Sequence, residues 1–294
     1  MSIHKPVLLH ETIEILNPKA GAFFIDGTLG GGGHANAIVE KIGKSGTLLG
    51  MDWDNEAVER FEKTDAHRAN VILRNANYDS IPEILTREKL EKADGLLLDL
   101  GFSSFQIEDA KRGFSFQADG PLDMRYAKEG ATAADVVNGL REEELADIFW
   151  KYGDERFSRQ IAKRIVEERR KEKILTTGRL RDVVTGAFPA RFRNGKVNPA
   201  TKVFQALRIY VNHEFENIES LLRKLQGVVK SGGRVAVITF HSTEDGIVKN
   251  AFREMVKAGK AELLTKKPIV PTREEVRENP RSRSAKLRGI KLLP

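Results

Sequence analysis

The first hundred residues alternate between two hydrophobic periods. Short apolar, β-branched runs are each followed by a stretch in which apolar residues recur every three or four positions. This alternation predicts successive strand–helix units and a parallel sheet, which is half of a doubly wound α/β fold. The predicted strands are 23–28, 47–53, 70–75 and 95–100, and the predicted helices are 34–42, 55–63 and 80–90.

The pattern changes after residue 101. A loop-rich region leads into helical patterns at 131–138, 142–151, 156–171 and 177–187. Strand–helix alternation then resumes with a helix at 201–229, a Gly232-Gly233 turn, a strand at 234–240, a helix at 244–257, and strands at 261–265 and 284–293. We therefore predict a Rossmann-like doubly wound domain formed by 1–105 and 201–294, with an inserted all-helical domain at 106–200.

Composition excludes several classes of function. Hydrophobic residues make up 40% and charged residues 31% of the 294 residues, as in ordinary globular proteins. The absence of cysteine excludes disulfides, thiolate zinc sites and a cysteine nucleophile. No apolar run reaches the roughly 20 residues of a membrane span, and the first residues do not resemble a signal peptide. We expect a cytoplasmic protein with no membrane partner, and no spacing of His, Asp and Glu predicts a metal site.

The net charge of +7 is unevenly distributed. Residues 154–196 and 266–291 are strongly basic, whereas the remainder of the chain is acidic. Two surfaces that bind a polyanion would give this distribution, but so would solvated helix faces with mixed ion pairs. Charge alone does not separate the two interpretations.

The strongest local signal is a glycine-rich turn after the first predicted strand, Asp-Gly-Thr-Leu-Gly-Gly-Gly-Gly-His at 26–34. Glycines let the backbone approach a ligand closely and direct free amides at the start of the next helix. A nucleotide or nucleoside cofactor is indicated. Gly30, Gly32 and Ala35 also satisfy the pattern G-x-G-x-x-A, so a nicotinamide oxidoreductase is a competing interpretation.

Two further residues follow predicted strands. Asp52 ends the second strand about twenty residues after the glycines, where a carboxylate accepts hydrogen bonds from ribose hydroxyls. Asp54 is better explained as the N-cap of the next helix. Tyr78 follows the third strand, where it either packs on an adenine ring or anchors the loop.

Asp99 ends the fourth strand in Asp-Leu-Gly-Phe-Ser-Ser-Phe-Gln, at 99–106. Further motifs follow in order: Gly-Phe-Ser-Phe at 113–116, Asp-Gly-Pro-Leu-Asp-Met-Arg at 119–125, the segment 201–212, Phe-His-Ser-Thr-Glu-Asp at 240–245 and Asn-Pro-Arg-Ser-Arg-Ser at 279–284. With these motifs nearly the whole chain resembles the MraW family of small-subunit ribosomal RNA cytosine-N4 methyltransferases. Tyr126 and Thr243 depart from the family pattern, where Met and Leu are usual, and neither lies in a cofactor motif.

The resemblance implies a class I methyltransferase that uses S-adenosylmethionine to methylate N4 of a cytidine in 16S ribosomal RNA, near the decoding centre of the small ribosomal subunit. Its partner is that RNA or the small subunit, and the oligomeric state is not indicated. A nicotinamide oxidoreductase and a non-catalytic ribosome-binding protein are the alternatives. The cofactor contacts that the resemblance implies are Gly32, Gly33, His34, Asp52, Tyr78, Asp99 and Gln106. For His34 we favour a contribution from the backbone amide alone.

Methylation of N4 requires a group that accepts an amine hydrogen, and Asp99 is the first candidate. Asn212 and His241 either line the same pocket or cap a helix and satisfy backbone groups. An unpaired target base would stack on an aromatic ring, although we expect at least two of four nearby phenylalanines, Phe102, Phe105, Phe114 and Phe116, to be core residues. The helix 156–173 and the tail residues Arg281, Arg283, Lys286 and Arg288 are expected to bind phosphates.

Overall fold

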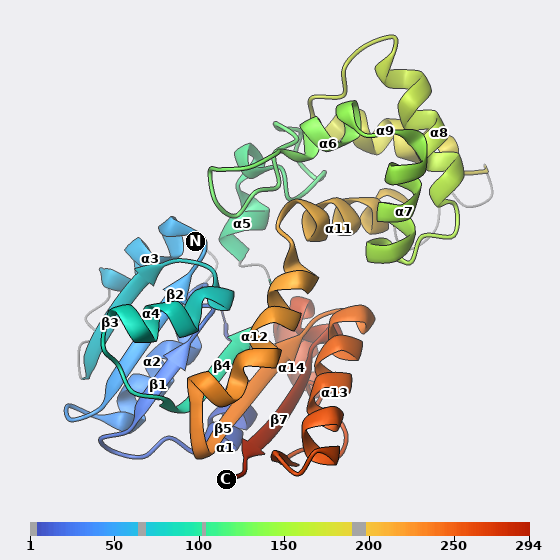
Figure 1. Cartoon of the computed structure of the whole chain (residues 1–294). Coiled ribbons are helices and arrows are strands. Elements are labelled where there is room, and N and C mark those ends of the chain that lie inside the picture. Colours follow the sequence, from blue (N-terminus) through green and yellow to red (C-terminus); the bar gives the residue numbers. More distant parts are fainter. Residues whose placement is uncertain (1–4, 64–68, 102–103, 190–197) are drawn as a thin grey trace. The chain divides into compact units, whose positions relative to one another are not determined.

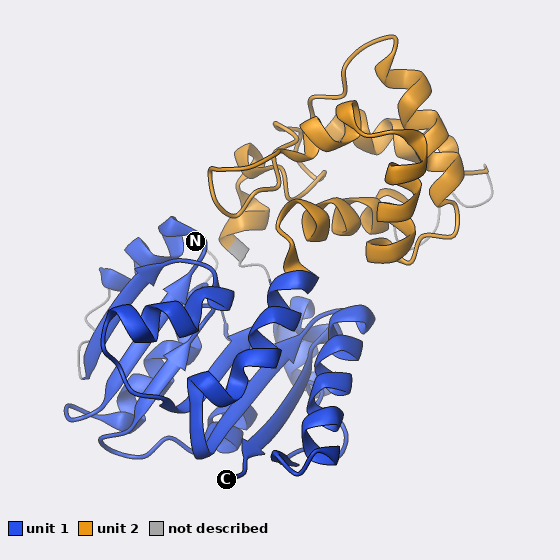
Figure 2. Cartoon of the chain, in the orientation of Figure 1, with its two compact units in different colours: residues 1–103, 215–294 blue, residues 104–214 orange. Residues whose placement is uncertain are grey.

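The chain folds into two compact units. A computed structural model describes residues 5–63, 69–101, 104–189 and 198–294. Unit 1 contains 1–103 and 215–294, and unit 2 contains 104–214 (Figure 2). The sequence predicted that the inserted domain spans residues 106–200. In the structure, unit 2 begins at residue 104 and ends at residue 214, fourteen residues after the predicted end.

Unit 1 is built on one mixed sheet (Figure 1). Its strand order is β3-β2-β1-β4-β5-β7-β6. The strands from β3 to β5 pair in parallel, and β7 runs antiparallel to both β5 and β6. The predicted doubly wound α/β fold is confirmed. The strands are β1 Phe23–Asp26, β2 Thr47–Asp52, β3 Asn70–Asn75, β4 Ala93–Asp99, β5 Val229–Thr239, β6 Ala261–Leu263 and β7 Lys286–Leu292.

The central strands are apolar on both faces, because helices cover both sides of a parallel sheet. Leu48, Leu97 and Ile238 are fully buried in a core to which helices α1 (Leu9–Leu16) and α2 (Gly33–Ile42) contribute Leu16 and Ile38. The sheet reverses its winding between β1 and β4, and ligands of such folds bind beside that point, at the carboxyl ends of the strands.

The helices of unit 1 include two that the sequence patterns did not predict, α1 and α14. Thr272 accepts a hydrogen bond from the Glu275 amide at the start of α14, a capping signal that is legible in the sequence. The predicted N-cap of α3 is confirmed, since Asp54 Oδ1 accepts from the Glu56 amide. The helices are α1 Leu9–Leu16, α2 Gly33–Ile42, α3 Asn55–Glu62, α4 Ile81–Arg87, α12 Glu214–Val228, α13 Ser242–Lys257 and α14 Arg273–Glu278.

Unit 2 is helical in its described residues, apart from short 3₁₀ turns and loops. Helix α7 packs on both α8 and α11, and α8 also packs on α9. Among the described helices of the chain, none is long and apolar enough to cross a membrane. The helices are α5 Ser104–Glu108, α6 Ala133–Gly139, α7 Glu142–Gly153, α8 Ser158–Arg169, α9 Thr177–Ala187 and α11 Ala200–Val211.

The prediction of one long helix at 201–229 is wrong. The structure has α11 and α12 separated at Asn212–His213, where His213 adopts a left-handed φ of 51°. Asn and His tolerate that conformation better than most residues, and the Asn212 side chain is engaged in hydrogen bonds to a loop. Amphipathic periodicity continued across the break, which concealed it.

Candidate active site

The turn between β1 and α2 requires glycine for conformational and steric reasons. Gly30 and Gly32 have φ values of 49° and 77°. A Cβ at Gly32 would lie 2.6 Å from the Phe61 ring, and one at Gly33 would lie 2.7 Å from Pro6. Within the described residues, no side chain caps the first turn of α2 with a hydrogen bond. Its first amide groups therefore point out of the helix with no capping side chain competing for them, as in a site for an anionic group.

Asp52 is held beside this turn by two backbone amides. Its Oδ2 accepts from the Gly30 amide and its Oδ1 from the Asp54 amide, both at 2.8 Å. Each carboxylate oxygen has a second lone pair, so the fixed carboxylate can still accept from two hydroxyl groups. This geometry is compatible with the predicted ribose contact.

A polar chain ties the carboxyl ends of β1 and β4 together. Asp26 Oδ1 accepts from the Thr28 amide at 3.0 Å, and the Thr28 hydroxyl oxygen accepts from the Asp99 amide at 2.7 Å. One oxygen of each carboxyl group, Asp26 Oδ2 and Asp99 Oδ1, is buried and has no hydrogen-bond partner within the described chain. Buried polar atoms are rarely left unpaired, and they recur where a ligand supplies the partner.

Burial raises the pKa of three carboxyl groups at this edge of the sheet. The pKa of Asp26 is raised to about 7 by burial and by the charge of Asp52. The pKa of Asp99 is also raised to about 7, by burial and by the charges of Asp26 and Glu244. The pKa of Asp52 is raised to about 6, again mainly by burial. The edge therefore concentrates negative charge, and a ligand with cationic and hydrogen-donating groups fits it.

The His34 side chain lies against Asp99. Its Nε2 is 3.0 Å from the Val7 carbonyl oxygen, which only accepts, so Nε2 carries the hydrogen. Its Nδ1 is 3.6 Å from Asp99 Oδ2, an ion-pair distance that is longer than a hydrogen bond. The sequence favoured the backbone amide of His34 alone. The structure adds a side chain that faces the candidate proton acceptor.

Tyr78 and Gln106, the other predicted cofactor contacts, lie in different units. Tyr78 begins a 3₁₀ turn after β3. It packs closely on Gly27, since a Cβ atom added at Gly27 would lie 3.0 Å from the Cβ of Tyr78. It is therefore at the ligand edge of the sheet, where both adenine packing and loop anchoring are compatible with its place. Gln106 is buried on α5 of unit 2, and its cofactor contact stays a prediction.

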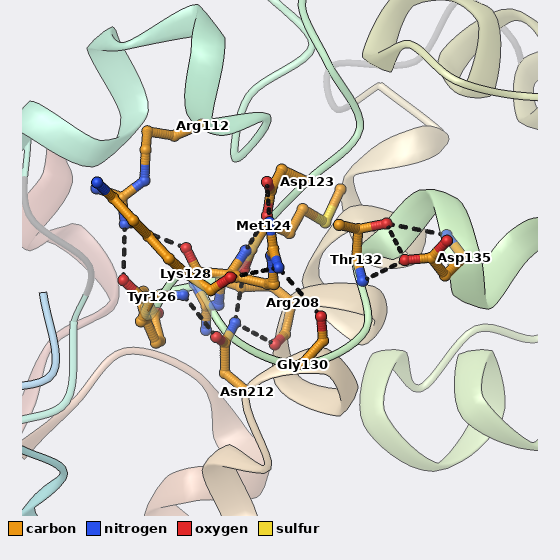
Figure 3. A network of polar contacts seen from close by, with 11 residues as sticks. Arg112, Asp123, Met124, Tyr126, Lys128, Gly130, Thr132, Asp135, Arg208 and Asn212 are labelled. Carbon is orange, nitrogen blue, oxygen red and sulfur yellow. Dashed lines mark hydrogen bonds and ion pairs between the residues drawn. The ribbon is translucent and has the colours of Figure 1, made fainter.

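Asn212 is occupied by backbone hydrogen bonds within unit 2 (Figure 3). Its Oδ1 accepts from the Tyr126 amide, and its Nδ2 donates to the carbonyl oxygens of Met124 and Arg208. Met124 has a left-handed φ of 65°. Of the two interpretations left open for Asn212, the geometry favours satisfaction of the backbone: Asn212 holds the loop that contains the motif at 119–125.

His241 is the N-cap of α13. Its Nδ1 accepts from the Glu244 amide at 3.4 Å, and the Glu244 carboxylate accepts from the His241 amide at 3.4 Å. This reciprocal arrangement is a capping box. The geometry therefore favours the capping interpretation of His241 over a catalytic one.

Two of the four phenylalanines are half-buried and pack on other aromatic rings within unit 2. Phe114 stacks on Tyr126 with ring centroids 5.3 Å apart, and Phe116 meets the edge of Phe204 at 4.9 Å. Phe105 is 36% exposed on α5. Phe102 lies outside the described residues.

The basic tail differs from the prediction. Arg288 is buried and forms two hydrogen bonds with Asp245, and Lys286 lies 3.3 Å from the same carboxylate. They are therefore committed to an ion pair inside unit 1, which the linear charge pattern did not reveal because Asp245 is distant in sequence. Arg281 and Arg283 are exposed.

Asp26, Thr28 and Glu244 also belong to the site, although no sequence pattern had indicated them. Asp26 ends β1 and is 1% exposed, and Glu244 is equally buried. A carboxylate at the last position of an apolar strand is a usable signal for Asp26, since an isolated buried charge is costly. Glu244 gave no such signal because its position in a helix start is explained by capping.

The strand order and the carboxylate-lined edge define a class I, Rossmann-like methyltransferase fold. The chain belongs to the MraW methylase family, which it matches over residues 1–293. Membership of a methylase family removes the nicotinamide oxidoreductase alternative.

Relatives align along nearly the full chain. A protein of Syntrophotalea carbinolica called ribosomal RNA small subunit methyltransferase H is 46% identical over 99% of this chain and 98% of its own length. A protein of the same name from Acidobacterium capsulatum is 47% identical over 97% of both chains.

Proposed function

We propose that this chain transfers a methyl group from S-adenosylmethionine to the N4 amine of a cytidine in 16S ribosomal RNA, near the decoding centre of the small subunit. The family and the names of its relatives support the methylation of small-subunit ribosomal RNA. The proposal includes a cytoplasmic location, which a ribosomal substrate supports. The observation that carries the chemistry is Asp99, a partly buried carboxyl group at the end of β4, of which one buried oxygen has no hydrogen-bond partner in the described chain.

The residues around the glycine turn suit the groups of S-adenosylmethionine. Asp52 accepts from the ribose hydroxyls, and the first amides of α2, from Gly33 and His34, receive the carboxylate of the methionine portion. Asp26 and Asp99 face its cationic groups. Gly32 provides the close backbone approach, and Tyr78 and Gln106 complete the predicted contacts.

S-Adenosylmethionine, when bound, supplies an electrophilic methyl group. The N4 lone pair of cytosine is delocalised into the ring, so the amine attacks weakly unless a hydrogen is withdrawn as the nitrogen–carbon bond forms. The bond between the methyl carbon and sulfur would break in the same step, and a neutral thioether would leave. Asp99 accepts that hydrogen through Oδ1, the carboxylate oxygen that has no hydrogen-bond partner among the described residues. A carboxyl group with a pKa of about 7 is a good proton acceptor near neutral pH, because its pKa is matched to the surroundings.

His34 and Thr28 hold Asp99 in place for this step. The Thr28 hydroxyl oxygen fixes the backbone amide of Asp99, and His34 Nδ1 faces Oδ2. His34 lies against the Oδ2 side of the carboxyl group, so Oδ1 is the oxygen that receives the hydrogen.

The test is Asp99→Asn under single-turnover conditions with saturating cofactor. Loss of a general base lowers the rate by about 10²–10⁴-fold, whereas cofactor affinity measured by calorimetry changes much less. The matched variant is Asp52→Asn, for which we expect weaker cofactor binding and a near-normal rate at saturation. Unchanged single-turnover methylation by Asp99→Asn would exclude Asp99 as the proton acceptor.

A further inference from the structure

Helix α8 of unit 2 carries its cations on two sides, and only one side is neutralised. On that side Glu168 is buried and is contacted by Arg164 at 3.0 Å, Lys171 at 2.9 Å and Arg179 at 3.0 Å. These cations hold α8 to the start of α9 and to the chain that connects the two helices. They are part of the framework of unit 2 and have little charge left for a partner.

The opposite side carries an unneutralised row of cations. Arg156, Arg159, Lys163 and Arg170, here called the outer stripe, are all exposed. None of their side chains forms an ion pair or a hydrogen bond with residues in the described parts of the chain. Residues four and seven apart lie on one face of a helix, so the last three of these residues form a line, and Arg156 precedes them in the turn before α8.

The outer stripe faces away from the core of unit 2. The buried residues of α8 include Ser158, Ile161 and Ile165, which lie on the opposite side of the helix. From Arg159 to Arg170 the stripe extends over about 16 Å of helix axis. Its one acidic neighbour on the same face is Glu167, four residues after Lys163. Three cations in a line, with Arg156 just before them, repel one another, which is a cost that an anionic partner would remove.

A large aromatic side chain is exposed just before the stripe in the chain. Trp150 lies in the last turn of α7, six residues before Arg156, and is 59% exposed. Helices α7 and α8 pack together. An exposed indole is a ring on which an unpaired base stacks, and basic residues that follow such a ring are the usual composition of a surface for single-stranded nucleic acid.

We propose that the outer stripe of α8, with Trp150, binds an RNA strand of the substrate away from the target cytidine: the stripe contacts phosphates, and Trp150 stacks on a base. This inference rests on the proposed function in that the partner is RNA. The stripe supplies affinity and orientation without sequence preference, because phosphate contacts carry no base information.

The experiment measures binding of the full chain to 16S ribosomal RNA transcribed in vitro, at several salt concentrations. The test variant is Arg159→Gln with Lys163→Gln and Arg170→Gln. The matched control is Lys19→Gln with Lys41→Gln and Lys44→Gln, three exposed cations near the amino ends of β1 and β2. Both variants lower the formal charge equally.

We expect the test variant to reduce the slope of log affinity against log salt by about 2, since each phosphate contact on a single strand contributes about 0.7. At 0.1 M salt the affinity falls by roughly tenfold to a hundredfold, and the control stays close to the unmodified chain. Glu167→Gln removes the one acid on that face and should tighten binding. Trp150→Ala weakens binding with little change in slope, because stacking is not ionic.

Equal losses in the test variant and the control would overturn the proposal. Loss of binding to assembled small subunits with unchanged binding to naked RNA would overturn it as well, because the occupant would then be an acidic protein. Methyl transfer is scored separately with the same proteins. If the stripe governs RNA binding but no nucleoside is methylated, the proposed function fails and the RNA surface stands.

Discussion

The free energy of unfolding of the ligand-free protein should fall less with rising pH in Asp26→Asn than in the unmodified chain. Asp26 is 1% exposed, and its pKa is raised from 3.8 to about 7 mainly by burial. The folded state therefore keeps a proton that the unfolded chain has already released. The associated stability is fully present below pH 3.8 and is lost as the pH rises through about 7.

The size of the effect follows from the pKa values. Stability changes by about 1.4 kcal/mol per pH unit for one proton, so the two units from pH 5 to pH 7 correspond to about 3 kcal/mol. Asn cannot ionise, so this loss disappears. Its NH₂ group takes the place of the unpartnered Oδ2 and costs about 1–3 kcal/mol at every pH. The change with pH is therefore the quantity to compare.

The assay is urea unfolding of the ligand-free chain at pH 5 and pH 8, followed by tryptophan fluorescence. The chain has two tryptophans, Trp53 and Trp150, so a Trp150→Phe background reports on unit 1 alone. The control is Glu40→Gln, an exposed carboxylate on α2. We expect the unmodified chain to lose about 3 kcal/mol more than Asp26→Asn between the two pH values. Parallel losses in the two proteins would refute a buried, proton-binding Asp26.

The sequence was informative where periodicity and backbone geometry are local. The parallel strands, the glycine turn and the Asp54 N-cap were predicted because each depends on residues that are close in the chain. The break at Asn212–His213 was not, because it depends on hydrogen bonds to a loop 86 residues earlier. The Asp245–Arg288 pair was missed for the same reason. Asp26 and Asp99 show the limit for chemistry: the sequence placed only Asp99 at a strand end, and the structure shows that β1 ends at Asp26 and that the two carboxyl groups share one edge of the sheet.

Three further predictions concern stability. Asn212→Ala leaves the backbone groups of Tyr126 and Met124 without their partner and should lower the free energy of unfolding of unit 2 by about 1–3 kcal/mol, measured by urea unfolding; an unchanged midpoint would contradict the role of Asn212. Glu214→Ala removes the buried carboxylate that accepts two hydrogen bonds from Arg208, so the free energy of unfolding should fall by about 3–5 kcal/mol in the same assay. A fall of less than about 1 kcal/mol would contradict this role of Glu214. Asp54→Ala should cost about 1 kcal/mol in thermal unfolding because α3 loses its N-cap, whereas Asp54→Ser should restore most of it.

The central claim is tested most directly by identifying the product. The purified chain is incubated with S-adenosylmethionine and with small ribosomal subunits, or their naked RNA, that lack the modification. The RNA is then digested and its nucleosides are identified by mass spectrometry. We expect N4-methylcytidine with the unmodified chain and none with Asp99→Asn. A methyl group on another atom of cytidine, on another nucleoside or on protein, or no methylation by a chain that binds the cofactor, would contradict the account.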